Sequence, residues 1–191
     1  KVVDASGNPV AGVSVSFATA DAGATVGTTT ATTNAQGLAS STWSFGTKSG
    51  TQVVTATSAG LVNSPLSFTA SVAAGAASKI VFVTTPSATG ANRSPLSVQP
   101  VLEVQDEFGN PVTVAGTSVT VAIASGGGTL TNATVTTDAS GRATFAGLTL
   151  AGTVGARTLS FATAGLPAVT APVTLTAGAA TTITVVSGNG G

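Results

Sequence analysis

The chain has 191 residues, of which 6% are charged, and its six Lys and Arg residues balance six Asp and Glu residues to a formal net charge of zero. It contains no Cys and no His, which excludes a disulfide framework, cysteine- or histidine-ligated metals and any catalytic unit built on histidine. Six scattered cations do not form the clustered basic surface that nucleic acids require, and no apolar run is long enough for a membrane span. We therefore expect no nucleic-acid partner, no membrane insertion and no cofactor.

Apolar and polar residues alternate along much of the chain, as they do in strands with one buried and one wet face. In chain order, this alternation predicts strands near residues 13–18, 66–72, 119–124, 158–162 and 181–187. Short turns rich in Gly, Asn and Pro separate the runs, and no window keeps a helical period. Such a pattern, at about seven strands per 100 residues, predicts an all-β chain of antiparallel sandwiches placed end to end.

Four short motifs occur twice, in the same order and 102 to 105 residues apart. Residues 4–10 recur as 106–112, 33–37 as 137–141, 59–61 as 164–166 and 75–77 as 178–180. Two copies of one unit follow from this order. We expect a first domain at residues 1–74 that lacks its N-terminal strand or strands, and a second domain at 75–178. Residues 179–191 are expected to be the first strand of a following repeat or a donor strand.

Trp43 is the single Trp of the chain, and we expect it to anchor the core of the first domain. Leu148 is predicted to hold the matching position in the second domain.

The repeated motifs predict turns held by side chains. An Asp or Asn at the start of a turn accepts backbone N–H bonds, Gly adopts a positive φ, and Pro returns the chain to an extended form. The residues predicted to have these structural roles are Asp4, Gly7, Asn8, Pro9, Asn34 and Gly37 in the first copy, and Asp106, Gly109, Asn110, Pro111, Asp138 and Gly141 in the second.

Few residues are suited to catalysis or metal binding. The neighbouring acids Asp106 and Glu107 would point to opposite faces of a strand, so they do not make an acid–base pair. Calcium needs six to eight oxygen ligands, and the chain has no run of alternating Asp residues. A calcium site that combines Asp4 or Asp106 with backbone carbonyls remains an alternative to the structural role. We expect no enzyme activity.

The motifs resemble those of the bacterial immunoglobulin-like domain of the invasin/intimin type. The resemblance is carried by residues 104–112 (Val-Gln-Asp-Glu-Phe-Gly-Asn-Pro-Val), the strand that follows and residues 137–141, together with their counterparts in the first copy. It implies tandem seven-strand β-sandwiches of large surface adhesins, with an extracellular location on a bacterial cell. It also implies that the partners are adjacent immunoglobulin-like repeats, while the sequence names no host receptor.

Three functions are consistent with these features. The first is a stalk or spacer in an adhesin. The second is a fibre-forming subunit, in which Ile183 and Val185 of one copy donate a strand to the first domain of the next copy. The third and weakest is a carbohydrate-binding module that uses Trp43 or Phe108, because aromatic residues make up only 4% of the chain.

Overall fold

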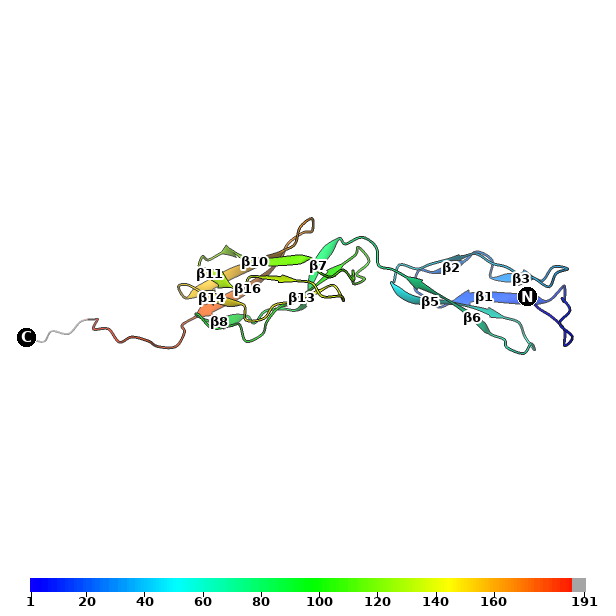
Figure 1. Cartoon of the computed structure of the whole chain (residues 1–191), viewed down its shortest axis with the longest axis horizontal. Coiled ribbons are helices and arrows are strands. Elements are labelled where there is room, and N and C mark those ends of the chain that lie inside the picture. Colours follow the sequence, from blue (N-terminus) through cyan, green and yellow to red (C-terminus); the bar gives the residue numbers. More distant parts are fainter. Residues whose placement is uncertain (187–191) are drawn as a thin grey trace, which may run out of the picture. The chain divides into compact units, whose positions relative to one another are not determined.

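In the computed structural model, which describes residues 1–186, every regular element is a β-strand (Figure 1). The chain divides into two units, Lys1–Gly75 and Ala76–Gly191, one residue beyond the boundary expected between residues 74 and 75. Among the described residues, no helix has the length and apolar character needed to cross a membrane.

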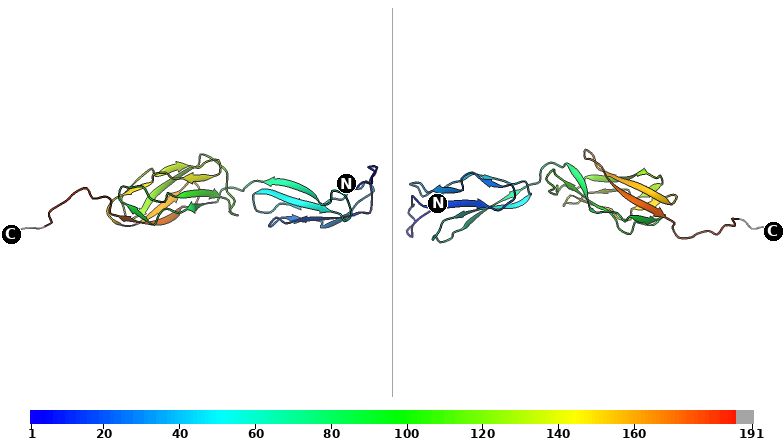
Figure 2. Two further views of the ribbon diagram at one scale, coloured as in Figure 1. Left: turned by 90° about the horizontal axis from the view of Figure 1, so that it is seen from below. Right: turned by 180° about the vertical axis from the view of Figure 1, so that it is seen from behind.

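The second unit is a two-layer sandwich (Figure 2). Its strands are β7 (Lys79–Thr84), β8 (Thr89–Ala91), β9 (Val101–Gln105), β10 (Ser118–Ser125), β11 (Thr129–Thr131), β12 (Thr134–Thr136), β13 (Arg142–Thr144), β14 (Thr149–Ala151), β15 (Gly155–Ala162) and β16 (Val169–Thr176). One sheet has the order β12-β10-β15-β16-β8 and the other the order β13-β9-β7, and β11 pairs with β14. All of these pairs are antiparallel except β16 and β8, which run parallel. The predicted all-β, immunoglobulin-like sandwich is confirmed.

The first unit repeats part of this arrangement. Its strands are β1 (Ser14–Thr19), β2 (Thr25–Val26), β3 (Thr30–Thr32), β4 (Trp43–Ser44), β5 (Gly50–Thr57) and β6 (Leu66–Val72). The order β3-β1-β5-β6 matches β12-β10-β15-β16, and the β2-β4 pair matches β11-β14. Within residues 1–75, all of which are described, there is no counterpart of β7 or β8. The counterpart of β9 is reduced to a single bridge between Val3 and Pro9, which matches the bridge between Gln105 and Pro111.

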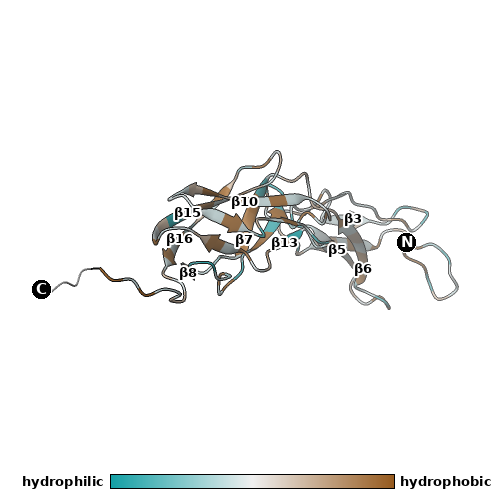
Figure 3. Ribbon diagram, turned by 60° about the vertical axis from the view of Figure 1, so that its left-hand side comes forward, coloured by the Kyte–Doolittle hydropathy of each residue, from teal (hydrophilic) through white to brown (hydrophobic). Residues whose placement is uncertain are grey.

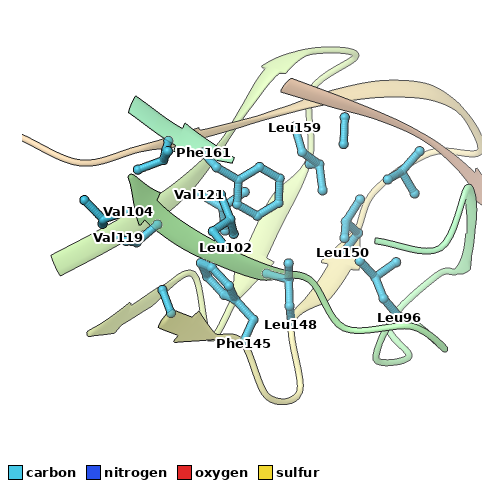
Figure 4. Close-up of a cluster of buried hydrophobic side chains, with 14 of the residues drawn as sticks. Leu96, Leu102, Val104, Val119, Val121, Phe145, Leu148, Leu150, Leu159 and Phe161 are labelled. Atoms are coloured by element: carbon cyan, nitrogen blue, oxygen red, sulfur yellow. The ribbon is translucent and has the colours of Figure 1, made fainter. Parts of the chain in front are cut away.

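The second unit has a continuous apolar core between its sheets (Figure 4). Phe161 is fully buried there, and its ring makes edge-to-face contacts with Phe82 and Phe145, at centroid distances of 5.2 and 5.5 Å. The first unit contributes only Val15 and Val54 to the buried apolar residues. The difference follows from the missing layer, because β7 and β9 supply one wall of the core of the second unit.

Trp43 is partly buried rather than enclosed by a core. Its ring packs edge-to-face on Phe45 at 4.8 Å, and Phe45 is itself 52% exposed. Trp43 pairs with Val26, as Leu150 pairs with Leu130. The residue that matches Trp43 is therefore Leu150, and the expected match with Leu148 is wrong by two positions. A loop between the repeated motifs changes length, which a comparison by sequence spacing alone does not detect.

The segment after β16 forms no strand up to the last described residue. Ile183, Val185 and Val186 are each at least 90% exposed, and Figure 3 shows apolar residues along this segment in brown. The strand expected at 181–187 is thus absent from the described part, because no sheet edge of the chain pairs with it. Residues 187–191 of the expected third repeat lie outside the described residues.

Candidate functional site

A turn closed by an aspartate recurs in both units. The Asp4 carboxylate accepts hydrogen bonds from the backbone N–H groups of Ser6 and Asn8, both at 2.9 Å, and from the Asn8 side-chain amide at 3.0 Å. Gly7, at φ 84°, lets the chain reverse within the turn.

Asp106 closes the matching turn in the second unit. Its carboxylate accepts the N–H groups of Phe108 and Asn110, at 3.0 and 2.8 Å, and the Asn110 side-chain amide at 2.8 Å. Gly109 has φ 86°, and Pro111 follows in the bridge to Gln105. The sequence motif therefore specifies the same hydrogen bonds twice.

The two Asp turns differ in burial. Asp106 is 1% exposed and Asn110 is 7% exposed, whereas Asp4 and Asn8 are exposed. The Asn8 side chain, followed by the backbone donors, lowers the pKa of Asp4 below its usual value because these hydrogen bonds stabilise the charged carboxylate. Water does not reach the buried turn to replace lost hydrogen bonds. The Asp carboxylate therefore contributes more to the stability of the second unit than to that of the first.

A second turn recurs beside the first. Asn34 Oδ1 accepts the N–H groups of Gln36 and Leu38, at 2.9 and 3.0 Å. Asp138 Oδ1 accepts the corresponding bonds from Ser140 and Arg142, at 2.8 and 3.1 Å, and also the Ser140 hydroxyl at 2.6 Å. The Ser140 hydroxyl, followed by these backbone bonds, lowers the pKa of Asp138.

The two turns of each unit are tied to each other through glycine. The Gly37 carbonyl accepts the N–H of Val2 at 2.8 Å, and the Gly141 carbonyl accepts the N–H of Val104 at 3.1 Å. Both glycines have positive φ, 70° for Gly37 and 80° for Gly141, and each lies against a neighbouring backbone. The turn residues predicted from the motifs thus form one cluster at the same end of each unit.

In this cluster, each unit also has a threonine hydroxyl that joins two backbone segments, which the sequence motifs did not predict. The Thr33 hydroxyl accepts the N–H of Val13 at 2.9 Å and donates to the carbonyl of Val10 at 2.8 Å. Thr137 does the same with Thr117 and Val114, at 3.0 and 2.7 Å. Both threonines are 4% exposed. Their signal in the sequence was the Thr that opens both copies of the second turn motif.

Two further residues that the sequence motifs did not predict, one in each unit, hold the loops at the opposite end of the unit. Gln52 is 2% exposed and bonds the backbone of Gly46 and Lys48. At the matching position, Arg157 is 5% exposed and donates to the carbonyls of Ala156 and Thr153. Because Gln and Arg are different residue types, no repeated sequence motif marked this position.

Glu103 forms the one ion pair among residues 1–186, with Arg142 Nε at 2.9 Å, and accepts a hydrogen bond from Gln105 at 2.9 Å. Burial would raise the pKa of Glu103, but the bonds from Gln105 and Arg142 and the positive charge of Arg142 outweigh burial and lower it.

The arrangement of acids offers little for metal binding or acid–base chemistry. Within the described residues, no group of three or more Asp or Glu side chains lies close enough to hold a metal ion. Both carboxylate oxygens of Asp4 and of Asp106 accept hydrogen bonds from their own turns, as described above. Glu107 is exposed while its neighbour Asp106 is buried, so the two acids do not face a common space.

A hollow of about 650 Å³ lies in the first unit between β1, β5 and β6 on one side and the N-terminal turn on the other. Its lining includes Val3, Val15, Phe17, Ala56, Leu66 and Phe68. Leu66 and Phe68 are 53% and 48% exposed. In the second unit, β7 and the ring of Phe161 occupy this part of the sandwich, and the residue that matches Phe161 in the first unit is Ala56.

Replacing Asp106 with Ala is expected to lower the free energy of unfolding of the second unit by about 2 kcal/mol, because buried donors lose their acceptor. Asp4→Ala is the matched control, and we expect a clearly smaller effect on the first unit because water reaches its donors. Urea unfolding followed by circular dichroism and by Trp43 fluorescence separates the two units. Equal losses for both variants would contradict the assigned role of burial.

Acid is expected to weaken both units. The pKa values of Asp4, Asp138 and Glu103 are lowered by folding, so their stabilisation is full above about pH 4, near their unfolded pKa values, and is lost as the pH falls further. Asp138→Asn should reduce this acid dependence in the second unit while keeping the turn, since Asn34 holds the matching turn. Urea midpoints measured between pH 3 and pH 7 check this, and an unchanged pH slope would contradict it.

No protein-family model matches the chain, and no curated protein sequence matches it. Among solved structures, the Escherichia coli adhesin FdeC is 25% identical with a TM-score of 0.55, over 92% of this chain and 56% of that one. InvD of Yersinia pseudotuberculosis is 23% identical with a TM-score of 0.51, over 96% of this chain and 53% of that one. The two units resemble bacterial immunoglobulin-like domains of the invasin/intimin type. This chain spans about half the length of the FdeC and InvD structures.

Proposed function

We propose that the chain is a load-bearing structural module of a bacterial surface adhesin, whose immunoglobulin-like units act as a spacer next to other repeats outside the cell. FdeC, a structure with the same fold, is an adhesin. The polar side chains repeated in both units bind the backbone of their own unit, as expected of residues that maintain a fold. No catalytic role is proposed for them.

The observation that carries this proposal is the parallel pairing of β8 with β16. These strands lie near opposite ends of the second unit in the sequence and pair from Thr174 opposite Thr89 to Thr176 opposite Ala91. Thr174 N–H donates to Ala88 O at 2.8 Å, and Asn92 N–H donates to Thr176 O at 3.0 Å. Tension between the two ends of the unit shears these bonds together rather than opening them one at a time, which resists unfolding.

Residues 1–75 contain no counterpart of β8, and within them β6 pairs only with β5. Force spectroscopy on the full chain is therefore expected to show the second unit unfolding at the higher force, with a release of roughly 300 Å, the extended length of about 100 residues less the folded span. Unfolding of both units at the same low force would contradict the load-bearing role.

A matched pair of proline variants tests the parallel ladder. Thr174→Pro removes the N–H that bonds Ala88, so unfolding of the second unit at fixed force should become about tenfold faster, as for the loss of about 1.4 kcal/mol. Ser71 holds the matching position on the edge strand β6, and Ser71→Pro should leave the force pattern of the second unit unchanged. Equal rates in wild type and Thr174→Pro would overturn the proposal.

A carbohydrate-binding role is the second candidate, favoured by the partly exposed pair Trp43 and Phe45. Phe108 is 59% exposed in the second unit and offers a single ring. Glycan-array binding by the purified chain that disappears in Trp43→Ala or Phe108→Ala would support this role. The spacer proposal expects no saturable binding.

A further inference from the structure

Arg157 carries a buried positive charge that no acid of the described chain pairs with. The residue is 5% exposed, and its guanidinium donates only to the carbonyls of Ala156 and Thr153 and, at 3.4 Å, to the Thr153 hydroxyl. Its Nε is buried and has no hydrogen-bond partner among residues 1–186. Because a guanidinium does not lose its proton in proteins, burying it without a counter-charge is costly.

The edge of the guanidinium that carries Nε faces two glycine loops. Nη2 lies on this edge, 3.5 Å from the point where a Cβ of Gly152 would be. The same point is 3.2 Å from the Cα of Gly128, so the two loops meet beside the charge. Gly126, Gly127, Gly128 and Gly152 are all exposed. Because these residues have no side chains, a small ion can approach their backbone close to the charge.

The loop of residues 126–128 also offers free backbone donors. The N–H groups of Gly126, Gly127 and Gly128 donate no hydrogen bond within residues 1–186. All three glycines have positive φ, at 93°, 68° and 112°. Successive N–H groups in a turn make concave sites for anions, and an oxyanion accepts several such bonds at once.

The first unit has a carboxylate of its own at the matching loop. Asp21 lies between β1 and β2, as the glycine loop lies between β10 and β11, and its Oδ2 accepts the N–H of Val53. The residue that matches Arg157 there is the neutral Gln52. The loop of the first unit therefore combines an acid with a neutral residue, whereas the loop of the second unit has a cation and no acid.

The charges of the second unit are separated along β10. Asp138 follows β12, which pairs with the start of β10, and Asp106 lies in the same cluster of turns. The glycine loop follows the other end of β10, at Ser125. Arg93 is exposed and its N–H donates to a β14 carbonyl at 2.9 Å, and β14 lies with β11 at this end (Figure 1). This end of the unit therefore has a positive potential, which attracts anions.

We propose that the glycine loop 126–128 and Arg157 form a site for an oxyanion, either a carboxylate or a phosphate group. The glycine N–H groups donate to the oxyanion, Arg157 stabilises its charge, and Arg93 adds to the positive potential. All of these residues lie between positions 93 and 157, inside one unit. This inference goes beyond the spacer role and does not depend on it.

NMR titration of the isotope-labelled full chain with acetate and with phosphate, at constant ionic strength, tests the proposal. We expect saturable shifts of the amide signals of residues 126–128 and of the Arg157 Nε–H signal. Arg157→Gln introduces the residue that the first unit has at this position, and it should weaken binding about tenfold because the positive charge is lost. Lys79→Gln removes a cation at the other end of the unit and should leave binding unchanged.

A second pair of variants keeps Arg157 in place. Nothing lies within 4 Å of a Cβ added to Gly127, and Asp tolerates a positive φ better than most residues. Gly127→Asp supplies a carboxylate inside the loop, as Asp21 does in the first unit, and should abolish binding of the added anions. Gly127→Ala has the same backbone strain without the carboxylate and should still bind them.

A third titration, with N-acetylaspartate methylamide, distinguishes the sources of the oxyanion. Binding of this compound and acetate without phosphate would identify an acidic side chain of a protein as the ligand, and binding of phosphate as well would identify free oxyanions. The absence of saturable shifts with all three ligands would overturn the proposal. Equal binding by wild type and Arg157→Gln, or by Gly127→Asp and Gly127→Ala, would also overturn it.

Discussion

Phe161→Ala is expected to lower the free energy of unfolding of the second unit by about 4 kcal/mol. Phe161 is fully buried on β15, and its ring contacts both Phe82 on β7 and Phe145. Truncation removes the ring from the centre of the core and leaves a cavity between two sheets that the remaining strands hold apart.

Urea unfolding followed by circular dichroism measures this loss, because the single Trp lies in the first unit and reports on that unit alone. Phe108→Ala is the control within the same unit. Phe108 is 59% exposed, so its loss should cost less than about 1 kcal/mol. A loss below about 1.5 kcal/mol for Phe161→Ala would show that the core does not depend on the contact between the two sheets.

Gly141→Ala is expected to destabilise the second unit by about 3 kcal/mol. An added Cβ would lie 2.2 Å from the Val112 carbonyl oxygen, which is backbone and cannot move aside without breaking the contact between the two turns. The positive φ of Gly141, 80°, adds a penalty of about 1–2 kcal/mol for any residue with a Cβ.

Gly116→Ala separates the two contributions. Gly116 also has a positive φ, 85°, but nothing lies within 4 Å of its added Cβ. It should therefore cost only the conformational part, about 1 kcal/mol. Thermal unfolding of both variants checks the difference, and equal losses would contradict the argument that the turns pack against each other. Gly37→Ala should repeat the larger effect in the first unit, where the added Cβ would lie 2.4 Å from Val2 O.

The sequence alone was sufficient where local chemistry decides the structure. The alternation of Val119 and Val121 predicted a strand with one buried face, and the Asp-Gly-Asn-Pro spacing predicted a turn closed by Asp106. Both depend on residues close together in the chain, and the repeat supplied a second example of each.

Features that depend on distant residues could not be predicted in this way. Thr89–Ala91 does not alternate and contains a central Gly, so nothing local marks β8 as the parallel partner of β16. The burial of Asp106 and the exposure of Asp4 arise from one motif in two surroundings. The partial exposure of Trp43 is a further case, because Leu150 at the matching position of the second unit is 1% exposed.

In the second unit the β7 layer closes the core, and residues 1–75 contain no counterpart of that layer. Hydrogen exchange of the full chain measures this directly. The pairs β5-β6 and β15-β16 have closely matching registers, so local hydrogen bonding alone would protect them alike. We predict that amides in β5 and β6 exchange at least a hundredfold faster than those in β15 and β16. Equal protection of the two pairs would contradict the account.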